Sequence, residues 1–221
     1  MLSALSKGLR TLLKKNSREL SSVESNILSA AKGREIKTIL VTSSTNFEGK
    51  TTSAISMAYG LSTETNAKVL LVDANLRSPK LYELFDVDSA PGLSDLVMSD
   101  TEYDDVIRKT EDENLVIMPH GTETTNTLDI FRSKLFKEKL DLLKQKLDYV
   151  IFDGCSILGS SDSSVVAKYF DGVIIVVECE KTRREVFLEA QEKINNVGGY
   201  VLGGVLSRRK YHIPKILYGK I

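Results

Sequence analysis

The chain has 221 residues, of which 42% are hydrophobic and 27% are charged, a balance that excludes a disordered or fibrous protein. No apolar run approaches the ~18 residues of a transmembrane helix, the first twenty residues do not resemble a secretory signal, and the two cysteines lack disulfide or metal-ligand spacing. Thirty acids balance thirty Lys and Arg, but ten of these cations lie in residues 1–18 and 207–221, which contain no acid. The acidic body between them argues against nucleic acid as a partner, and we expect a cytoplasmic protein.

The first 35 residues form a basic arm that we predict to be separate from the following domain. Its leucines recur at helical spacing with Lys and Arg on the opposite face, which predicts an amphipathic helix. Two interpretations remain open. The helix packs on its own domain or on a partner protein, or it lies on an anionic membrane surface. The apolar face comprises Leu2, Leu5, Leu9, Leu12 and Leu13.

From residue 38 onward, short apolar runs rich in Val and Ile alternate with longer helical patterns. Each run is nearly all apolar, as expected for strands of a parallel sheet covered on both faces. The order predicts an α/β fold with a doubly wound, mostly parallel sheet, over residues 36–208, followed by a tail at 209–221. We predict strands at 38–44, 68–74, 115–121, 149–154, 172–178 and 200–206, and helices at 50–63, 79–86, 127–146, 162–169 and 183–196.

The stretch STNFEGKTT follows the first predicted strand and opens the first long helix. A Gly-Lys-Thr at such a turn points backbone N–H groups and a helix N-terminus at the phosphates of a nucleotide. Lys50 would reach the β and γ phosphates, and the Thr51 hydroxyl would hold Mg²⁺. Ser44 stands where the full pattern has glycine, so a chance Gly-Lys-Thr is the alternative. The predicted nucleotide contacts are Ser44, Asn46, Phe47, Glu48, Gly49, Lys50, Thr51 and Thr52.

Two further strands end in an aspartate. The segment VLLVDANLR contains Asp73, and YVIFDG contains Asp153. In a parallel sheet both carboxylates emerge at the carboxyl edge, beside the phosphate loop. There they could orient Mg²⁺ or accept a proton from an attacking hydroxyl, whereas each alone could be a helix cap.

Residues 36–208 resemble the bacterial tyrosine kinases of capsule and exopolysaccharide synthesis, P-loop NTPases related to partition-type ATPases. The resemblance rests on VLLVDANLRSP with Lys50 and Asp153, on GLSDLV, and on FDGCSILGSSDSSVVAKYFDGVIIVVE, in which Asp162 matches an aspartate of the family. It implies ATP and Mg²⁺ as cofactors. By the family's roles, the catalytic residues are Lys50, Asp73, Arg77 and Asp153, and the metal ligands are Thr51, Asp73 and Asp153. Arg77 could instead pair with an acid on the surface. At the adenine edge, where the family often has Asn-Arg, this chain offers Ser207 and Arg208.

The resemblance also implies a cellular setting. A membrane polysaccharide co-polymerase or adaptor protein would be the partner, and the chain would act at the inner face of the membrane, with homo-oligomer formation left open. Tyr211 and Tyr218 in the tail are candidate phosphoacceptors. The same tail carries apolar residues among five cations, which alternatively suits docking onto a membrane or an acidic partner.

Several positions depart from the family pattern. Asn46-Phe47 replaces Pro-Gly, Asn75 replaces a second acid, and Ser156 replaces a proline. Phe47 is compatible with a phosphate cradle if its φ is negative. The arginine-containing assembly helix of the family has no match in SSVESNILSA. Two rival functions are therefore kept: an adaptor that binds ATP but transfers nothing, and a positioning ATPase of the partition class.

Three further residues carry separate expectations. His120 and His212 are each predicted to be surface or packing residues, because neither lies near an acid cluster with metal-ligand spacing. Cys155 is predicted to be a small buried filler rather than a reactive thiol.

Overall fold

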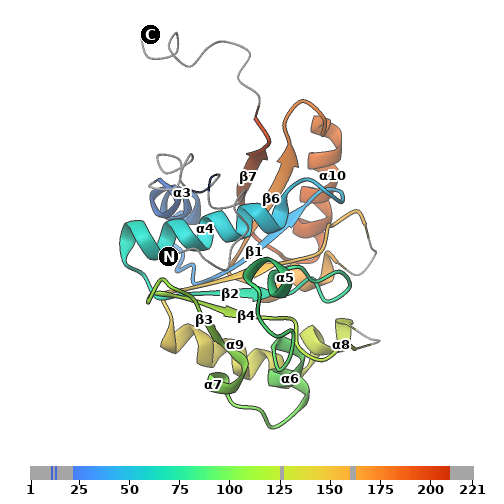
Figure 1. Cartoon of the computed structure of the whole chain (residues 1–221). Helices are drawn as coiled ribbons and strands as arrows, with labels where there is room; N and C mark the ends of the chain where they lie inside the picture. The colour runs from blue at the N-terminus through green and yellow to red at the C-terminus, as the bar shows by residue number, and fades with distance from the viewer. Residues whose placement is uncertain (1–10, 12, 14–21, 125–126, 160–162, 210–221) are drawn as a thin grey trace.

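The computed structural model describes residues 11, 13, 22–124, 127–159 and 163–209. Its centre is a seven-stranded sheet in the order β3-β4-β2-β5-β1-β6-β7 (Figure 1). All neighbouring strands are parallel except β3 and β4, which are antiparallel. The strands are β1 (Thr38–Ser43), β2 (Val69–Asp73), β3 (Arg108–Lys109), β4 (Leu115–Met118), β5 (Tyr149–Asp153), β6 (Gly172–Glu178) and β7 (Val201–Ser207).

The central strands are apolar on both faces because helices cover both sides of the sheet. Every residue of β1, β2 and β5 is buried, which is the pattern of a parallel sheet inside a doubly wound fold. The predicted fold class is therefore confirmed. By contrast β7, at one edge, is only partly buried along its length.

Each face of the sheet has its own core and its own helices. One core includes residues of α3 (Val23–Ala31), α4 (Lys50–Thr65) and α5 (Leu81–Phe85). The opposite core includes residues of α6 (Leu93–Met98), α7 (Tyr103–Val106), α8 (Thr127–Arg132), α9 (Lys134–Lys146), the 3-10 helix η1 (Val165–Tyr169) and α10 (Arg184–Asn196). Figure 1 shows α4 crossing one side of the sheet, with α9 below and α10 beside β6.

The predicted elements differ from the structure in a few places. The helix expected over 127–146 is divided, because the Ser133 hydroxyl accepts the Phe136 N–H at 3.0 Å and starts α9 anew. The short elements β3, α6 and α7 were not predicted, because runs of two to six residues carry too little periodicity. The strand expected to reach residue 121 ends at Met118.

Part of the amino-terminal arm packs on the domain. Leu13 is helical and 1% exposed, in the same core as Ile27 of α3. Tyr149 donates a hydrogen bond to Glu24, and Tyr200 donates one to the carbonyl of Ala30. The other leucines of the predicted amphipathic face lie outside the described residues, so the division at residue 35 stays a prediction. Within the described ranges, no helix is long and apolar enough to cross a membrane.

Candidate functional site

The phosphate loop connects the end of β1 to the start of α4. Gly49 caps the helix with φ 89°, a left-handed conformation that glycine adopts without strain, and Lys50 and Thr51 are the first two helical residues. The first N–H groups of a helix have no acceptor within it and carry the positive end of its dipole. The loop therefore has the backbone geometry of an anion cradle, with the Lys50 cation at its rim.

Contacts from distant segments hold this loop. Ser207, the last residue of β7, donates a hydrogen bond of 2.5 Å to the Glu48 carbonyl, and its side chain also packs beside Gly49. Ser156 donates one of 2.7 Å to the Asn46 side chain. Ser156 thus connects the segment after β5 to the phosphate loop, at a position where the family pattern has proline. The predicted nucleotide residue Ser207 lies against the loop.

Phe47 does not meet the condition of a negative φ that the sequence analysis placed on it. Its φ is +65°, not negative, and its ring is 82% exposed. A bulky residue in this region costs roughly 1 to 3 kcal/mol and persists only where neighbouring contacts impose it. Because the ring faces solvent, it does not fill the space beneath the loop.

The two strand-tip aspartates lie side by side. Asp73 and Asp153 are register partners on the adjacent strands β2 and β5, and both are fully buried. The Asp73 carboxylate accepts N–H groups from Lys80 and Leu81 at 2.9 Å each, and from Asn75 at 3.3 Å. Burial raises the pKa of Asp73, although these N–H groups oppose the rise. The start of α5 therefore orients this carboxylate.

Asp153 has no such support. Among the described residues, neither of its buried oxygens has a hydrogen-bond partner. Burial, together with the neighbouring Asp73, raises its pKa to about 7, against the opposing effects of Thr51 and Lys50. The Thr51 hydroxyl thus lies near enough to favour the anion, but it makes a hydrogen bond of good geometry to neither oxygen.

An orphaned carboxylate beside the Thr51 hydroxyl fits a divalent cation. Buried polar groups are almost always paired, so two unpaired oxygens at one position indicate a missing ligand. Across the part of the chain that the structure describes, no group of three or more His, Cys, Asp or Glu could hold a metal ion by itself. Mg²⁺ is typically bound by one or two protein oxygens together with substrate phosphates and water, and Thr51 with Asp153 would fit such a set.

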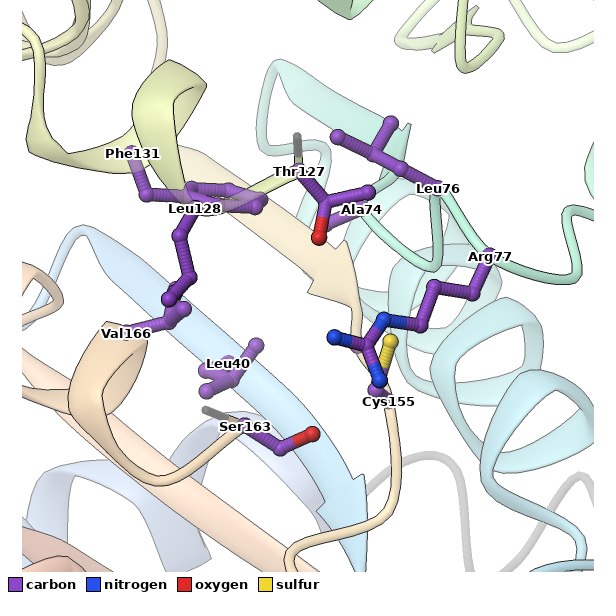
Figure 2. A pocket seen from close by; sticks show the side chains of 11 residues that line it. Leu40, Ala74, Leu76, Arg77, Thr127, Leu128, Phe131, Cys155, Ser163 and Val166 are labelled. Carbon is purple, nitrogen blue, oxygen red and sulfur yellow. The ribbon is translucent and has the colours of Figure 1, made fainter. Parts of the chain in front are cut away.

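A pocket opens beside the carboxylates (Figure 2). Its walls come from the residues that follow β2 and β5, from α8 and from the start of η1, and they are mainly apolar. Figure 2 shows the Arg77 side chain extending toward the Cys155 sulfur. The lining residues include Ala74, Leu76, Arg77, Leu128, Phe131 and Cys155. The pocket therefore places the predicted catalytic cation Arg77 next to both strand tips.

Cys155 is half-buried and linked to the neighbouring loop. Its thiol donates a hydrogen bond of 3.0 Å to the Asn75 side-chain oxygen. Burial raises the pKa of this thiol, partly offset by Lys50 and Arg77, so the group is not activated as a thiolate. The expectation of a plain buried filler is thus incomplete, because the thiol also orients Asn75.

His120 packs beside the strand-tip carboxylates. It is 6% exposed and its ring lies 5.4 Å from that of Tyr82, which confirms a packing role. It also lies near Asp73, since it opposes the rise that burial causes in the pKa of that carboxyl. The sequence carried no signal for this proximity, because it arises from the pairing of β2 with β4.

The remaining predicted residues divide into two groups. Arg208 has φ +53° and its guanidinium pairs with Glu178 at 2.9 Å, so an adenine contact from it stays a prediction. Tyr211, Tyr218, Asp162 and His212 lie outside the described residues. Sequence reasoning missed Thr182, whose hydroxyl donates to the Glu48 carboxylate, because it lies 134 positions away along the chain.

The sheet order, the loop and the strand-tip aspartates define a P-loop nucleotide-binding protein. Residues 36–198 match the AAA domain family, and the chain belongs to that family. Tyrosine-protein kinase YwqD of Bacillus subtilis (strain 168) is 27% identical over 88% of this chain and 82% of its own. Tyrosine-protein kinase CpsD of Streptococcus agalactiae serotype III (strain NEM316) is 26% identical over 88% and 83%.

Solved structures agree with this assignment. The chimerical protein CapA2B2 superposes with a TM-score of 0.81 at 27% identity, covering 88% of this chain and 85% of its own. The septum site-determining protein MinD of Pyrococcus horikoshii OT3, complexed with Mg-ADP, has a TM-score of 0.64 at 24% identity, with coverages of 82% and 75%, and shares the fold alone. The predicted resemblance to bacterial tyrosine kinases is confirmed.

Proposed function

We propose that this chain binds Mg-ATP and transfers the γ-phosphoryl group to a tyrosine hydroxyl, in the regulation of capsular or exopolysaccharide synthesis. The observation that carries the proposal is the orphaned, buried Asp153 beside the first turn of α4. A buried carboxylate without partners is costly, and a nucleotide-bound cation would offset that cost. The tyrosine kinases among the relatives support the choice of acceptor.

Each residue of the site has a role in this proposal. Lys50 and the N–H groups of the loop hold the β and γ phosphates, while Thr51 and Asp153 supply oxygens for Mg²⁺. Mg²⁺ would neutralise charge on the phosphates. Asp73, fixed by the start of α5, accepts the proton of the attacking hydroxyl. Arg77 offsets negative charge on the transferring group, and the apolar pocket beside it could receive the ring of an acceptor.

The partner and the location are also proposals. We propose a membrane polysaccharide co-polymerase or adaptor as the partner, with the chain at the inner face of the membrane and able to form a homo-oligomer. The tail contributes either as the acceptor, through Tyr211 or Tyr218, or as a basic and apolar dock.

One rival is favoured by a specific observation. Asn75 stands where the family pattern has a second acid, and its side-chain oxygen is already occupied by the Cys155 thiol. A site with one fewer negative charge can bind nucleotide while transferring phosphate poorly, which describes a nucleotide-gated adaptor. A positioning ATPase of the partition class has only fold-level support.

A single incubation separates these functions. The purified protein is mixed with labelled Mg-ATP, with and without the neighbouring membrane protein, and assayed for phosphotyrosine and free phosphate. Phosphotyrosine supports the kinase, free phosphate alone supports the positioning ATPase, and binding without either product supports the adaptor. A Tyr211→Phe, Tyr218→Phe double variant that still becomes phosphorylated would remove the tail as acceptor.

The nucleotide site itself is tested by calorimetry. Lys50→Met should abolish Mg-ATP binding while leaving the fold intact, because it removes the cation at the loop. Lys134→Met, on the exposed surface of α9, is the matched control, since the Lys134 side chain is 92% exposed. Equal affinity of the wild type and the Lys50 variant would contradict nucleotide binding at this loop.

A further inference from the structure

A buried carboxylate lies inside the phosphate loop. Glu48 is 2% exposed and immediately precedes the capping residue Gly49. An anion at this place would repel the phosphates of a nucleotide unless its own charge were already satisfied. Its presence therefore needs an explanation within the loop.

Both carboxylate oxygens of Glu48 accept hydrogen bonds. One accepts the backbone N–H of Thr45 at 2.7 Å, which closes the loop upon itself. The other accepts the hydroxyl of Thr182, which lies between β6 and α10. That hydroxyl in turn accepts the N–H of Glu178 at 3.1 Å, so its proton is directed at Glu48.

We call Glu48, Thr45, Thr182 and Ser207 together the clamp. The clamp holds the backbone on both sides of the strained residue Phe47. Thr45 lies two positions before Phe47 and Glu48 lies directly after it, while the Glu48 carbonyl is held by Ser207. Nothing about a phenylalanine favours its φ of +65°. Such strain persists only where surrounding contacts over-determine the backbone, and the clamp supplies those contacts.

We propose that Glu48 is a positioning residue, whose carboxylate holds Phe47 in the left-handed conformation and so shapes the phosphate loop before nucleotide binds. The inference rests on the proposed nucleotide-binding function. It explains how a loop without the first glycine of the usual pattern, and with phenylalanine at a left-handed position, keeps the form of a cradle.

The test is the effect of Glu48→Gln on Mg-ATP affinity, measured once with Phe47 in place and once in the Phe47→Gly variant. The amide has one acceptor and one donor group, so it cannot accept from both Thr45 and Thr182. With Phe47 in place, the loop should relax, and Mg-ATP affinity measured by calorimetry should fall about tenfold to a hundredfold, the equilibrium equivalent of strain at one residue. In the Phe47→Gly background the same change should cost less than about threefold, because glycine adopts this conformation without strain.

Companion variants exclude a general loss of structure. Thr182→Val removes the hydroxyl and should weaken Mg-ATP binding as Glu48→Gln does. Thr182→Ser retains the hydroxyl and should bind Mg-ATP like the wild type. Glu138→Gln on α9 makes the same chemical change at an exposed ion pair and should leave affinity unaltered. All variants are compared at a temperature where circular dichroism shows them folded, and amide exchange of residues 44–49 should accelerate only when the clamp is broken.

The outcomes separate the two proposals. Equal losses of affinity from Glu48→Gln in both backgrounds, or no loss in either, would overturn the positioning role while leaving nucleotide binding in place. A wild type that does not bind Mg-ATP would overturn the proposed function, and the inference with it. The positioning role is supported if Glu48→Gln lowers Mg-ATP affinity more with Phe47 than with Phe47→Gly, and if Thr182→Ser keeps the affinity of the wild type.

Discussion

Two aspartates beside the central strand β1 have the same side chain and opposite surroundings. Asp171 precedes β6 at the amino edge of the sheet, and Asp153 ends β5 at the carboxyl edge. Asp171 accepts hydrogen bonds from the Lys37 N–H, from both the N–H and the hydroxyl of Thr38, and from the Lys144 ammonium at 2.7 Å. Asp153 accepts none from the residues that the structure describes.

Their ionisation differs accordingly. Burial by itself would raise the pKa of Asp171, but hydrogen bonds from Lys144 and Thr38 outweigh burial and lower it. Burial and the neighbouring Asp73 raise the pKa of Asp153 to about 7. The carboxylate at the amino edge is saturated by the protein and stabilises the fold. The Asp153 carboxylate at the carboxyl edge destabilises the nucleotide-free fold when it is ionised. This is expected of a carboxylate that serves as a metal ligand.

The largest expected effect comes from Asp153→Asn. Between pH 4 and 7 the folded protein keeps a proton that the unfolded chain loses, so the cost of this carboxyl grows as pH rises and is complete above pH 7. The difference between 3.8 and about 7 corresponds to about 4 kcal/mol, an upper estimate. The variant should therefore be more stable than the wild type at pH 8 without nucleotide, and nearly equal at pH 4, by urea unfolding.

The stabilisation that Mg-ATP gives the wild type should shrink in the same variant. If Asp153→Asn lowers stability at pH 8, the carboxylate is not an unsatisfied group and the comparison with Asp171 fails.

Asp171→Asn should have the opposite sign and the opposite pH window. A carboxyl with a lowered pKa contributes stability above pH 4, and this contribution is lost as pH falls through its folded pKa. Because the amide turns a donor toward Lys144 or Thr38, the variant should lose about 2 to 3 kcal/mol at pH 7 and progressively less as pH falls below 4. Urea unfolding over a pH series that ends where Asp171 is protonated in the folded wild type measures this, and a loss that does not shrink along the series would show that the effect is not electrostatic.

Asp73→Asn tests whether the carboxyl edge of the sheet binds the cation. Unlike Asp153, Asp73 is oriented by the start of α5, and Asn keeps that shape while removing one negative charge. Mg-linked affinity for ATP should weaken by about 1 to 3 kcal/mol, while affinity measured in EDTA should change less. Equal nucleotide affinity of the wild type with and without Mg²⁺ would contradict a cation at this edge.

Ser156→Ala should give the smallest effect. It removes the 2.7 Å hydrogen bond to Asn46 without touching either carboxylate. The expected loss of stability is about 0.5 to 1.5 kcal/mol and independent of pH between 4 and 8, because neither partner titrates. A strongly pH-dependent loss would indicate that the segment after β5 also controls Asp153.

Much of the site could be predicted locally. A strand followed by EGKTT specifies a phosphate loop, and an apolar run ending in aspartate specifies a carboxylate at a strand tip, since both depend on a few adjacent residues. That Asp73 and Asp153 share the carboxyl edge followed from the parallel sheet, whereas their pairing on adjacent strands did not. The left-handed Phe47 did not follow, because its conformation is imposed by contacts from elsewhere.

The sequence by itself determined the longer strands and most of the longer helices, the chemistry of the loop and the edge of the sheet at which that chemistry gathers, because secondary structure follows short-range periodicity. Only the tertiary structure decided which carboxylate is satisfied and which is orphaned, that His120 lies near Asp73, and that Thr182 supports Glu48. Those properties depend on strand order, which brings residues separated by tens of positions into contact. They depend also on burial, which makes a hydrogen bond or its absence worth several times more than at the surface.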